Sequence, residues 1–321
     1  MNLLITGGSG FIGARLVGEL LDAGHEVAIF DLAGSVAHPD RCIRGDVRDR
    51  EALTVAAAGR DTIIHLAAEH RDDARSASLC DQVNVGGSEN VVAAARQANC
   101  RRIIFVSSVA VYPLNVREST EEAPPRPYNR YGQSKLKAEQ VFRQWALSSP
   151  GAALVMVRAC VVFGEGNRGN VYNLLRQIHR RRFVMVGRGR NRKSIAYVGN
   201  LTRFLATCLD APSGVHLYNY ADKPDFSAAE LVGLVNRALG RSTSRFRLPY
   251  FVGLAGGLAY DALARLTGRD YPLSSARVRK FCAETTISTQ RLERTGFVRP
   301  YALEEALVQT VRHEFQQSGP S

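Results

Sequence analysis

Tyr131 and Lys135 stand four residues apart in the segment Tyr131-Gly132-Gln133-Ser134-Lys135. On a helix this spacing puts both side chains on one face, so an ammonium group can lie close to a phenol. A nearby ammonium favours the phenolate and lowers the pKa of the phenol from its usual value of about 10. A tyrosine prepared in this way can take a proton from a substrate hydroxyl. Because the same spacing is common on helix surfaces, its meaning depends on the elements around it.

A pair of serines ends a predicted strand upstream of that helix. The strand covers residues 102–107 and runs into Ser107-Ser108, and a proline-rich loop then leads to the helix at 131–147. Parallel sheets hold their ligands at the carboxyl ends of their strands, so Ser108 is expected to meet the same substrate oxygen as Tyr131. Ser108, Tyr131 and Lys135 are therefore the predicted catalytic residues.

A glycine motif follows the first predicted strand, in Thr6-Gly7-Gly8-Ser9-Gly10-Phe11-Ile12-Gly13. Gly7 and Gly10 let the backbone approach a pyrophosphate without a Cβ in the way, and Gly13 allows the next helix to pack closely on the strand. The free N–H groups at the start of that helix suit phosphate oxygens. Glycines at this spacing also occur in purely structural turns, so the motif needs support from the next strand.

That support comes from Asp31, which ends the second predicted strand. A carboxylate about 20 residues after the glycine motif can bind the adenosine ribose hydroxyls, and it repels a 2′-phosphate. Arg41 and Arg44 lie downstream and weaken that preference. The pattern predicts NAD as the cofactor, in preference to NADP.

Short apolar segments alternate with helical patterns through the first half of the chain. Strands are expected at residues 2–6, 26–31, 62–66, 102–107 and 154–157, and helices at 11–23, 88–98 and 131–147. This alternation predicts an α/β fold, a Rossmann-type doubly wound parallel sheet with a smaller, mostly C-terminal substrate domain. Residues 1–163 are expected to form the NAD-binding domain, with 195–222 returning to it. Residues 164–194 and 223–321 are expected to form the substrate-binding domain.

The composition limits the choice of partners. Forty-two Lys and Arg against 30 Asp and Glu give a net charge of +12, which suits a nucleic acid, an anionic membrane face or a phosphorylated substrate, although a biased genome composition explains it equally well. Nucleic-acid binding is not expected, because no recognisable motif for it occurs. Six scattered cysteines indicate reduced thiols and neither a disulfide framework nor a metal site. With no signal peptide and no long apolar run, a cytoplasmic protein is expected.

The motifs in this order resemble the extended short-chain dehydrogenase/reductase family, and within it the sugar-nucleotide epimerases and dehydratases. The matching segments are 6–13, Gly45-Asp46-Val47-Arg48-Asp49, His65-Leu66-Ala67-Ala68, Asn84-Val85, Ser107-Ser108-Val109-Ala110-Val111-Tyr112 and 131–135. The resemblance implies that Asp46 and Val47 hold the adenine. It also implies that the cofactor site includes Phe11, Ile12, Leu66, Ala67, Ala68, Asn84, Tyr131 and Lys135.

Longer segments resemble a narrower group, the bacterial 4-epimerases of N-acetylglucosaminyl-diphospho-undecaprenol, which serve O-antigen and lipopolysaccharide synthesis. These segments are residues 66–73, 167–175, 193–200, 218–225 and 278–282. The resemblance implies that the substrate is contacted by His70, Arg71, Ser108, Asn170 and Lys193. Where dehydratases carry an Asp-Glu pair, this chain has Val109 and Ala110, so dehydration is disfavoured. Lys193 replaces an arginine that relatives use against a nucleotide diphosphate, and it meets a phosphate only as a point charge.

The expected reaction is therefore an epimerisation. Tyr131 would remove the proton of the sugar 4-hydroxyl while hydride passes from C4 to NAD, and hydride would return to the other face of a 4-keto sugar. A UDP-sugar 4-epimerase and an NAD(P)H-dependent 4-keto-sugar reductase are the alternatives among enzymes. A non-catalytic NAD-binding protein on the same fold is the alternative outside them.

One further stretch has more than one interpretation. Residues 248–266 are apolar on all sides for about three helical turns, which is typical of a core helix or of an oligomer interface such as a homodimer. Tyr250, Phe251 and Tyr260 also suit a lipid headgroup boundary, and the basic clusters at 180–182, 188–193 and 277–280 suit anionic lipids. Peripheral contact with the inner face of the cytoplasmic membrane is the functional interpretation of this stretch.

Overall fold

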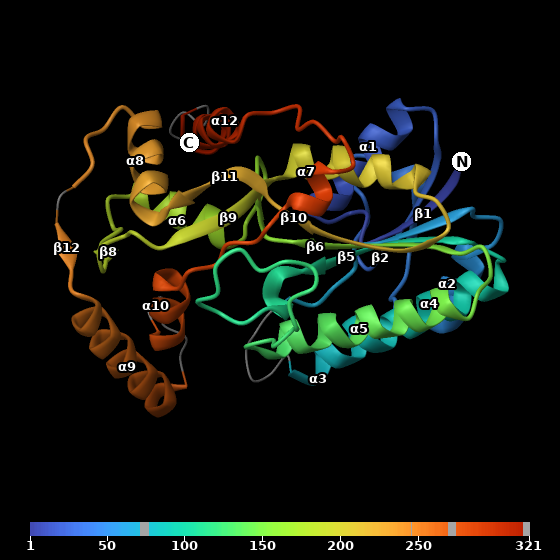
Figure 1. The fold of residues 1–321 in the computed structure, drawn as a ribbon, viewed down its shortest axis with the longest axis horizontal. Helices are drawn as coiled ribbons and strands as arrows, with labels where there is room; N and C mark the ends of the chain where they lie inside the picture. The colour runs from blue at the N-terminus through green and yellow to red at the C-terminus, as the bar shows by residue number, and fades with distance from the viewer. Residues whose placement is uncertain (71–76, 245, 269–273, 317–321) are drawn as a thin grey trace.

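A seven-stranded parallel sheet forms the centre of the larger part of the molecule (Figure 1). The structure is a computed structural model and describes residues 1–70, 77–244, 246–268 and 274–316. Its strand order is β10-β6-β5-β4-β1-β2-β3, and every neighbouring pair is parallel. The strands are β1 (Asn2–Thr6), β2 (Glu26–Asp31), β3 (Cys42–Arg44), β4 (Thr62–His65), β5 (Arg102–Ser108), β6 (Ala153–Ala159) and β10 (Gly214–Tyr220). The predicted doubly wound α/β fold is confirmed.

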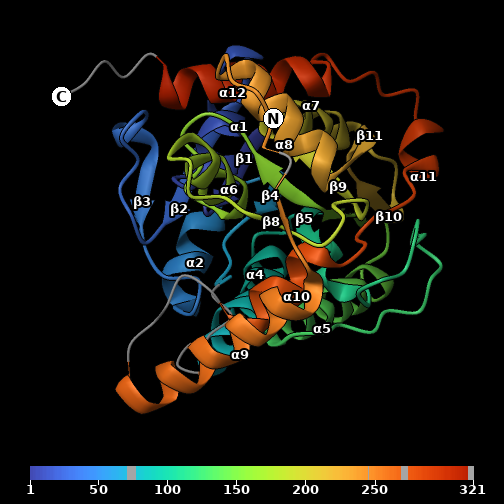
Figure 2. The same ribbon diagram turned by 90° about the vertical axis from the view of Figure 1, so that its left-hand side faces the viewer.

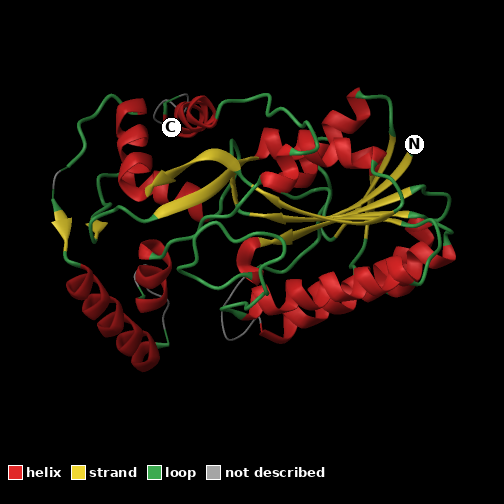
Figure 3. Ribbon diagram, viewed as in Figure 1, coloured by secondary structure: helices red, strands yellow, loops and turns green. Residues whose placement is uncertain are grey.

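Helices cover both faces of this sheet, which is why its strands are apolar along nearly their whole length (Figure 3). Helices α1 (Phe11–Asp22) and α7 (Val198–Thr207) pack on one face, and α2 (Arg50–Ala57), α4 (Gly87–Gln97) and α5 (Arg130–Leu147) pack on the other. In β4 and β6 every residue is buried. The short helical elements of this part are α3 (Ala77–Cys80), α11 (Gln290–Glu293), η1 (Pro39–Arg41), η3 (Val109–Val111), η4 (Cys208–Asp210) and the π-helical turn η2 (Asp81–Gly86).

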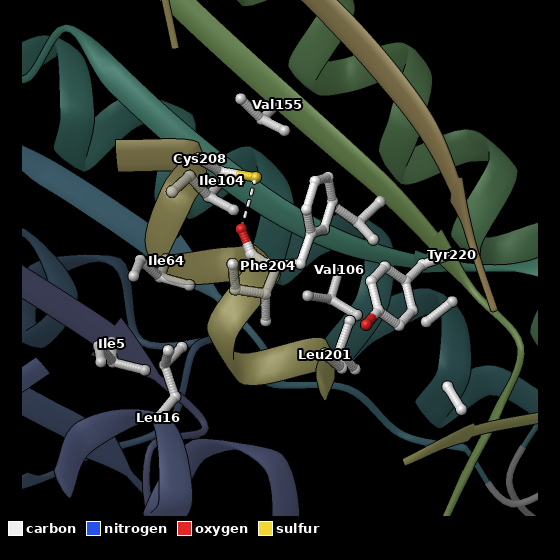
Figure 4. Close-up of a cluster of buried hydrophobic side chains, with 14 of the residues drawn as sticks. Ile5, Leu16, Ile64, Ile104, Val106, Val155, Leu201, Phe204, Cys208 and Tyr220 are labelled. Carbon is white, nitrogen blue, oxygen red and sulfur yellow. Dashed lines mark hydrogen bonds between the residues drawn. The ribbon is translucent and has the colours of Figure 1, made fainter. Parts of the chain in front are cut away.

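Phe204 lies in the hydrophobic core between the large sheet and helices α1 and α7 (Figure 4). Its ring centroid is 5.3 Å from that of Tyr220 and 5.5 Å from that of Tyr218, both on β10. The Cys208 thiol donates a hydrogen bond of 3.2 Å to the Phe204 carbonyl oxygen, so the end of α7 is held as well. The ring thus ties α7 to the edge strand that returns to the large sheet.

A smaller sheet and three helices form the second part of the molecule. The sheet has the order β11-β9-β7, from β7 (Val161–Phe163), β9 (Arg192–Tyr197) and β11 (Asp222–Ser227). Helices α6 (Asn170–His179), α8 (Ala228–Ala238) and α12 (Leu303–Phe315) share a separate core with it. A two-stranded sheet of β8 (Met185–Val186) and β12 (Arg247–Leu248) leads to α9 (Tyr250–Thr267) and α10 (Ser275–Cys282).

The chain passes between the two parts more than once. After β7 it stays with the small sheet as far as β9, and then α7 and β10 lie with the large sheet. Of the segment expected to return at 195–222, residues 195–197 therefore pair within the small sheet as the end of β9. The boundaries drawn between the two domains stay a prediction.

Substituting Phe204 tests the link between α7 and β10. We expect Phe204→Ala to lower the free energy of unfolding by about 3–5 kcal/mol, since a fully buried ring would be replaced by a cavity. Urea unfolding followed by circular dichroism measures this change. Leu147→Ala, at an exposed position, should change the free energy by less than about 0.5 kcal/mol. Equal losses from the two variants would contradict the packing described.

Candidate active site

The structure brings Ser108 and Tyr131 into contact. Ser108 ends β5, and Tyr131 lies in the first turn of α5, which begins at Arg130. The two side chains interact, and hydrogen bonding by Ser108 favours the phenolate form of Tyr131. Asn129 caps the same turn, because its Oδ1 accepts a hydrogen bond of 2.9 Å from the Gly132 N–H. The two predicted catalytic hydroxyls therefore lie together at the carboxyl end of a central strand.

Gly132 is what allows α5 to approach β5 this closely. A Cβ at this position would collide with the carbonyl oxygen of Ala110, in the turn η3 that follows β5. The first turn of the helix therefore rests directly on η3. The distance between Tyr131 and Ser108 is therefore fixed by a backbone contact between α5 and η3, which side-chain rearrangement cannot change.

Burial, and not a neighbouring ammonium, dominates the pKa of Tyr131. Burial raises the pKa of this phenol to about 12, and the hydrogen bond from Ser108 only partly opposes the rise. The expectation that Lys135 lowers the pKa is wrong for this structure. Burial penalises a charged phenolate by more than the surrounding protein groups favour it.

Lys135 is itself a buried cation. Its Nζ lies 4.3 Å from the ring centroid of Phe105, so the ammonium meets the electron-rich face of an aromatic ring. Burial lowers the pKa of Lys135 to about 7, and the carboxylate of Glu139 acts against that lowering. The side chain therefore stands near the midpoint of its titration at neutral pH.

A buried ion pair lies beneath these residues. The Arg158 guanidinium donates to both oxygens of Glu139, at 2.9 Å from Nε and 2.7 Å from Nη2. Ser107 Oγ donates to the same carboxylate at 2.6 Å, and Arg158 Nη1 donates to the Tyr112 hydroxyl at 2.7 Å. Both partners of the pair are only 4% exposed. The pair fastens α5 to the ends of β5 and β6.

Sequence analysis did not identify this pair, although two signals were present. Residues 131, 135 and 139 repeat at four-residue spacing, so Glu139 shares a helix face with Tyr131 and Lys135. Arg158 stands at the end of an otherwise apolar buried strand. A charged residue in such a place needs a buried partner of opposite charge.

The loop before α1 has the shape of a phosphate-binding cradle. Gly7 has φ +74°, and a Cβ there would lie 2.6 Å from the Ala67 backbone nitrogen. At Gly13 a Cβ would collide with backbone atoms of Gly7 and Gly8, so the third glycine packs helix against strand. Among the described residues no side chain caps the helix N-terminus at Gly10. The N–H groups of this turn are thus left for an anion, and the residues present fit a dinucleotide.

Asp31 is held beside this loop. Its Oδ2 accepts a hydrogen bond from the Ser9 N–H and its Oδ1 accepts one from the Ala33 N–H, each at 3.0 Å. Arg41 pairs with Glu26, and Arg44 donates to the Leu32 carbonyl oxygen. The carboxylate keeps lone pairs for ribose hydroxyls, and both arginines are engaged with other groups. This arrangement supports the preference for NAD.

The predicted adenine residues lie next along the sheet edge. Arg48 binds Asp46 through Nε at 2.9 Å, and hydrogen bonding by Arg48 holds the pKa of that carboxyl below its ordinary value. Val47 is buried, and its carbonyl oxygen accepts a hydrogen bond of 3.0 Å from Asn90 Nδ2. These contacts fix both residues at the carboxyl edge of the sheet.

Asn84, in the π-helical turn η2, binds protein groups with both ends of its amide. Oδ1 accepts from the Glu69 N–H at 2.8 Å, while Nδ2 donates to the Glu69 carbonyl oxygen at 2.9 Å and to Ser134 Oγ at 2.8 Å. Asn84 thus ties the segment after Leu66, Ala67 and Ala68 to the catalytic helix. Its direct contact with the cofactor stays a prediction.

His65 is another residue whose role sequence analysis did not predict. Its Nδ1 lies 2.6 Å from Thr6 Oγ1, which joins the ends of β4 and β1, and its ring stacks on Phe105 at 5.6 Å between centroids. Burial lowers the pKa of His65 to about 3, with the charge of Lys135 adding to the effect. The ring is therefore neutral at physiological pH.

The residues expected to bind substrate are less closely grouped. His70 is exposed, Asn170 is the exposed first residue of α6, and Arg71 lies outside the described residues. Lys193 Nζ donates to the carbonyl oxygens of Lys280 at 3.0 Å and Ala283 at 2.8 Å. Burial lowers the pKa of Lys193 to about 8. Its visible role is to hold the end of α10, and its contact with a diphosphate stays a prediction.

The buried ion pair supplies a test of this arrangement. We expect Glu139→Gln to lower the free energy of unfolding by about 3–5 kcal/mol, because the guanidinium of Arg158 would be left buried without its counter-charge. Adding Arg158→Met to the same protein removes the unpaired charge and should restore part of the loss. Urea unfolding of the two variants measures both changes. A double variant no more stable than the single one would contradict the assigned pairing.

Known proteins resemble this chain along its whole length. The chain is 45% identical over 316 residues to N-acetyl-alpha-D-glucosaminyl-diphospho-ditrans,octacis-undecaprenol 4-epimerase of Escherichia coli O157:H7, which covers 98% of this chain and 95% of that protein. A UDP-glucose 4-epimerase of Thermus thermophilus, solved with NAD, superposes with a TM-score of 0.77 over 99% of this chain and 100% of that one, at 23% identity. A UDP-glucose 4-epimerase of Thermotoga maritima, solved with UDP-glucose, superposes with a TM-score of 0.80 over 99% of this chain and 100% of that one, at 19% identity.

The two solved structures establish the fold, and a family model establishes the family. The model of the NAD dependent epimerase/dehydratase family matches residues 3–221. That range contains the glycine loop, Asp31 and the contact between Ser108 and Tyr131. Because the match spans more than half of the chain, this protein belongs to the NAD dependent epimerase/dehydratase family.

Proposed function

We propose that this protein is an NAD-dependent 4-epimerase that interconverts N-acetylglucosamine and N-acetylgalactosamine on undecaprenyl diphosphate. One observation carries the proposal: the alignment to the Escherichia coli enzyme, at 45% identity, covers 98% of the chain and so includes the C-terminal half as well as the cofactor-binding half. A lipid-linked sugar of this kind would serve polysaccharide assembly, including O-antigen, at the cytoplasmic face of the membrane.

The geometry is suited to proton transfer at a sugar hydroxyl. Ser108 and Tyr131 offer two hydroxyl groups that can hold the sugar 4-oxygen between them, and Tyr131 can take its proton. Bound NAD would supply the hydride acceptor for C4 and add positive charge beside the phenol. Because the pKa of Tyr131 is about 12 in this structure, the phenol needs added positive charge to act as a base. That charge would come from bound NAD, because Lys135 is not among the groups that shift the pKa of Tyr131 here.

The turn after Ser108 supports epimerisation over dehydration. Val109, Ala110 and Val111 form η3, so that turn carries no carboxylate to serve as an acid or base for loss of water. Proton and hydride both return to the sugar in an epimerase cycle, so no external reductant is used. A UDP-sugar 4-epimerase and an NAD(P)H-dependent 4-keto-sugar reductase are the rivals that experiment must separate.

Removing the phenol hydroxyl tests the assigned base. We expect Tyr131→Phe to keep bound NAD but to lose at least about 100-fold in turnover, since the ring packing stays and the proton acceptor is gone. Turnover with the lipid-linked sugar and the NAD content of the purified protein give the two readouts. Tyr218→Phe, a matched change on β10, should leave turnover within about twofold. More than a tenth of wild-type activity in Tyr131→Phe would show that another group is the base.

The substrate is tested by direct comparison. Purified protein should turn over undecaprenyl-diphosphate-linked N-acetylglucosamine in detergent at a kcat/KM at least about 100-fold above that for UDP-N-acetylglucosamine, a difference of about 2.7 kcal/mol in transition-state stabilisation. No NADH or NADPH should be consumed as product forms. Efficient use of the UDP sugar would favour the UDP-sugar epimerase. Stoichiometric loss of reduced cofactor would favour the reductase.

A further inference from the structure

Helix α9 packs against the protein through its glycines. A Cβ at Gly253 would lie 2.6 Å from Val186 Cγ1, and a Cβ at Gly257 would lie 2.7 Å from the Ser275 backbone nitrogen. The helix therefore rests on β8 and on the start of α10 with its smallest residues. Figure 2 shows α9 beside α10 at the outer edge of the molecule.

The opposite side of α9 carries the large apolar side chains, and we call it the outer face. Phe251 is 72% exposed and Leu266 is 85% exposed. The outer face consists of Phe251, Val252, Ala255, Leu258, Ala259, Ala262, Leu263 and Leu266, all of which are exposed. Of the 19 exposed large hydrophobic residues in the described chain, eight fall within residues 246–266. Such a concentration marks a binding surface, because a soluble protein gains nothing by exposing it to water.

The surroundings of the outer face are basic. Asp261 is the one charged residue of α9 whose side chain the structure describes, and its Oδ2 accepts a hydrogen bond from the Ser275 N–H. On the neighbouring elements the exposed charged residues are Arg188, Arg190, Arg247, Arg277, Arg279 and Lys280. Over residues 241–282 the sequence holds eight Arg or Lys residues and two Asp residues. A neutral apolar strip bordered by cations complements an apolar layer bordered by anions.

We propose that the outer face of α9 inserts into the headgroup boundary of an anionic phospholipid bilayer, with the surrounding arginines and Lys280 meeting the lipid phosphates. The helix is about 27 Å long at 1.5 Å per residue, which suits a helix that lies in the plane of the interface. Across the described ranges, no helix combines the length and hydropathy needed to cross a bilayer. A second copy of this chain is a poorer occupant, because a twofold contact would set these cations against themselves.

This surface lies close to the candidate active site, and its use there rests on the lipid-linked substrate proposed above. Lys280 of α10 has its Nζ 5.7 Å from the ring centroid of Tyr128. Tyr128 immediately precedes Asn129, which caps the helix that carries Tyr131. Helix α10 thus contacts both α9 and the loop that leads to the catalytic tyrosine. A sugar held on a membrane lipid by a diphosphate could reach Tyr131 while its lipid stays in the bilayer.

Vesicle sedimentation tests the surface. The full protein with NAD is mixed with vesicles of phosphatidylethanolamine and phosphatidylglycerol at a ratio of about 3:1, and with vesicles of phosphatidylcholine alone. We expect binding to the anionic vesicles, at least about tenfold weaker binding to the neutral ones, and loss of binding in high salt. Phe251→Asp with Leu258→Asp should weaken binding to anionic vesicles by at least about tenfold, since both side chains would lose their apolar contact.

A matched variant controls for added charge. Leu147→Asp with Val298→Asp introduces the same two charges at positions that are 78% and 81% exposed and far from α9 in sequence, and it should change binding by less than about threefold. Melting temperature and NAD content check that both variants are folded. Equal losses of vesicle binding from the two double variants, or no vesicle binding by the wild type, would overturn the proposed membrane contact. So would conversion of a dimer to a monomer by the α9 variant without vesicle binding, because the occupant would then be a second copy.

The two proposals fail separately. Turnover of the lipid-linked sugar in detergent, together with no vesicle binding, would overturn the membrane surface and leave the proposed function standing. Vesicle binding together with turnover of the UDP sugar alone would overturn the proposed function and leave the surface standing. Loss of turnover by the α9 variant on vesicles, with full turnover in detergent, would support both.

Discussion

The burial of Lys135 is the constraint on which the rest of the site depends. A cation in the interior loses its hydration, and this loss lowers the pKa of Lys135 to about 7. The face of Phe105 and the carboxylate of Glu139 offset part of it. Glu139 is buried too, so it requires Arg158, which reaches it from β6 with two hydrogen bonds. The burial of Lys135 therefore depends on partners from two neighbouring strands, Phe105 on β5 and Arg158 on β6.

The buried cluster of Lys135, Glu139 and Arg158 carries a net positive charge when Lys135 is protonated. Arg158 neutralises Glu139, so protonation of Lys135 leaves the cluster with one positive charge, four residues along α5 from Tyr131. A positive environment favours a phenolate and a developing negative charge on a substrate oxygen. The raised pKa of Tyr131 keeps the phenol neutral at rest, and in the proposed mechanism it would act as a base only when further positive charge enters the site. In that mechanism the ionisation of Tyr131 would depend on the bound cofactor.

Much of the fold and part of the site could be predicted from sequence, for identifiable reasons. The strands at 2–6 and 26–31 have the predicted bounds because their central residues are apolar and buried on both faces, while polar residues stand at their ends. The glycine loop and Ser108 follow from local spacing. The pKa of Tyr131 could not be predicted, since the sign of its shift is decided by burial. Lys193 could not be placed either, because its two carbonyl partners lie about 90 residues further along the chain.

Helix α9 shows how a structure can decide between interpretations that a sequence leaves open. Its sequence is mostly apolar, which fits a core helix, an oligomer interface or a membrane contact. The positions of its glycines resolve the question, since Gly253 and Gly257 pack against Val186 and Ser275 at separations that no larger side chain could match. The large side chains are forced to the other side by this packing. A helix that covers a protein core usually turns its large apolar side chains toward that core, and α9 has the opposite order, with Phe251 and Leu266 exposed; this reversal is the observation on which the proposed membrane contact rests.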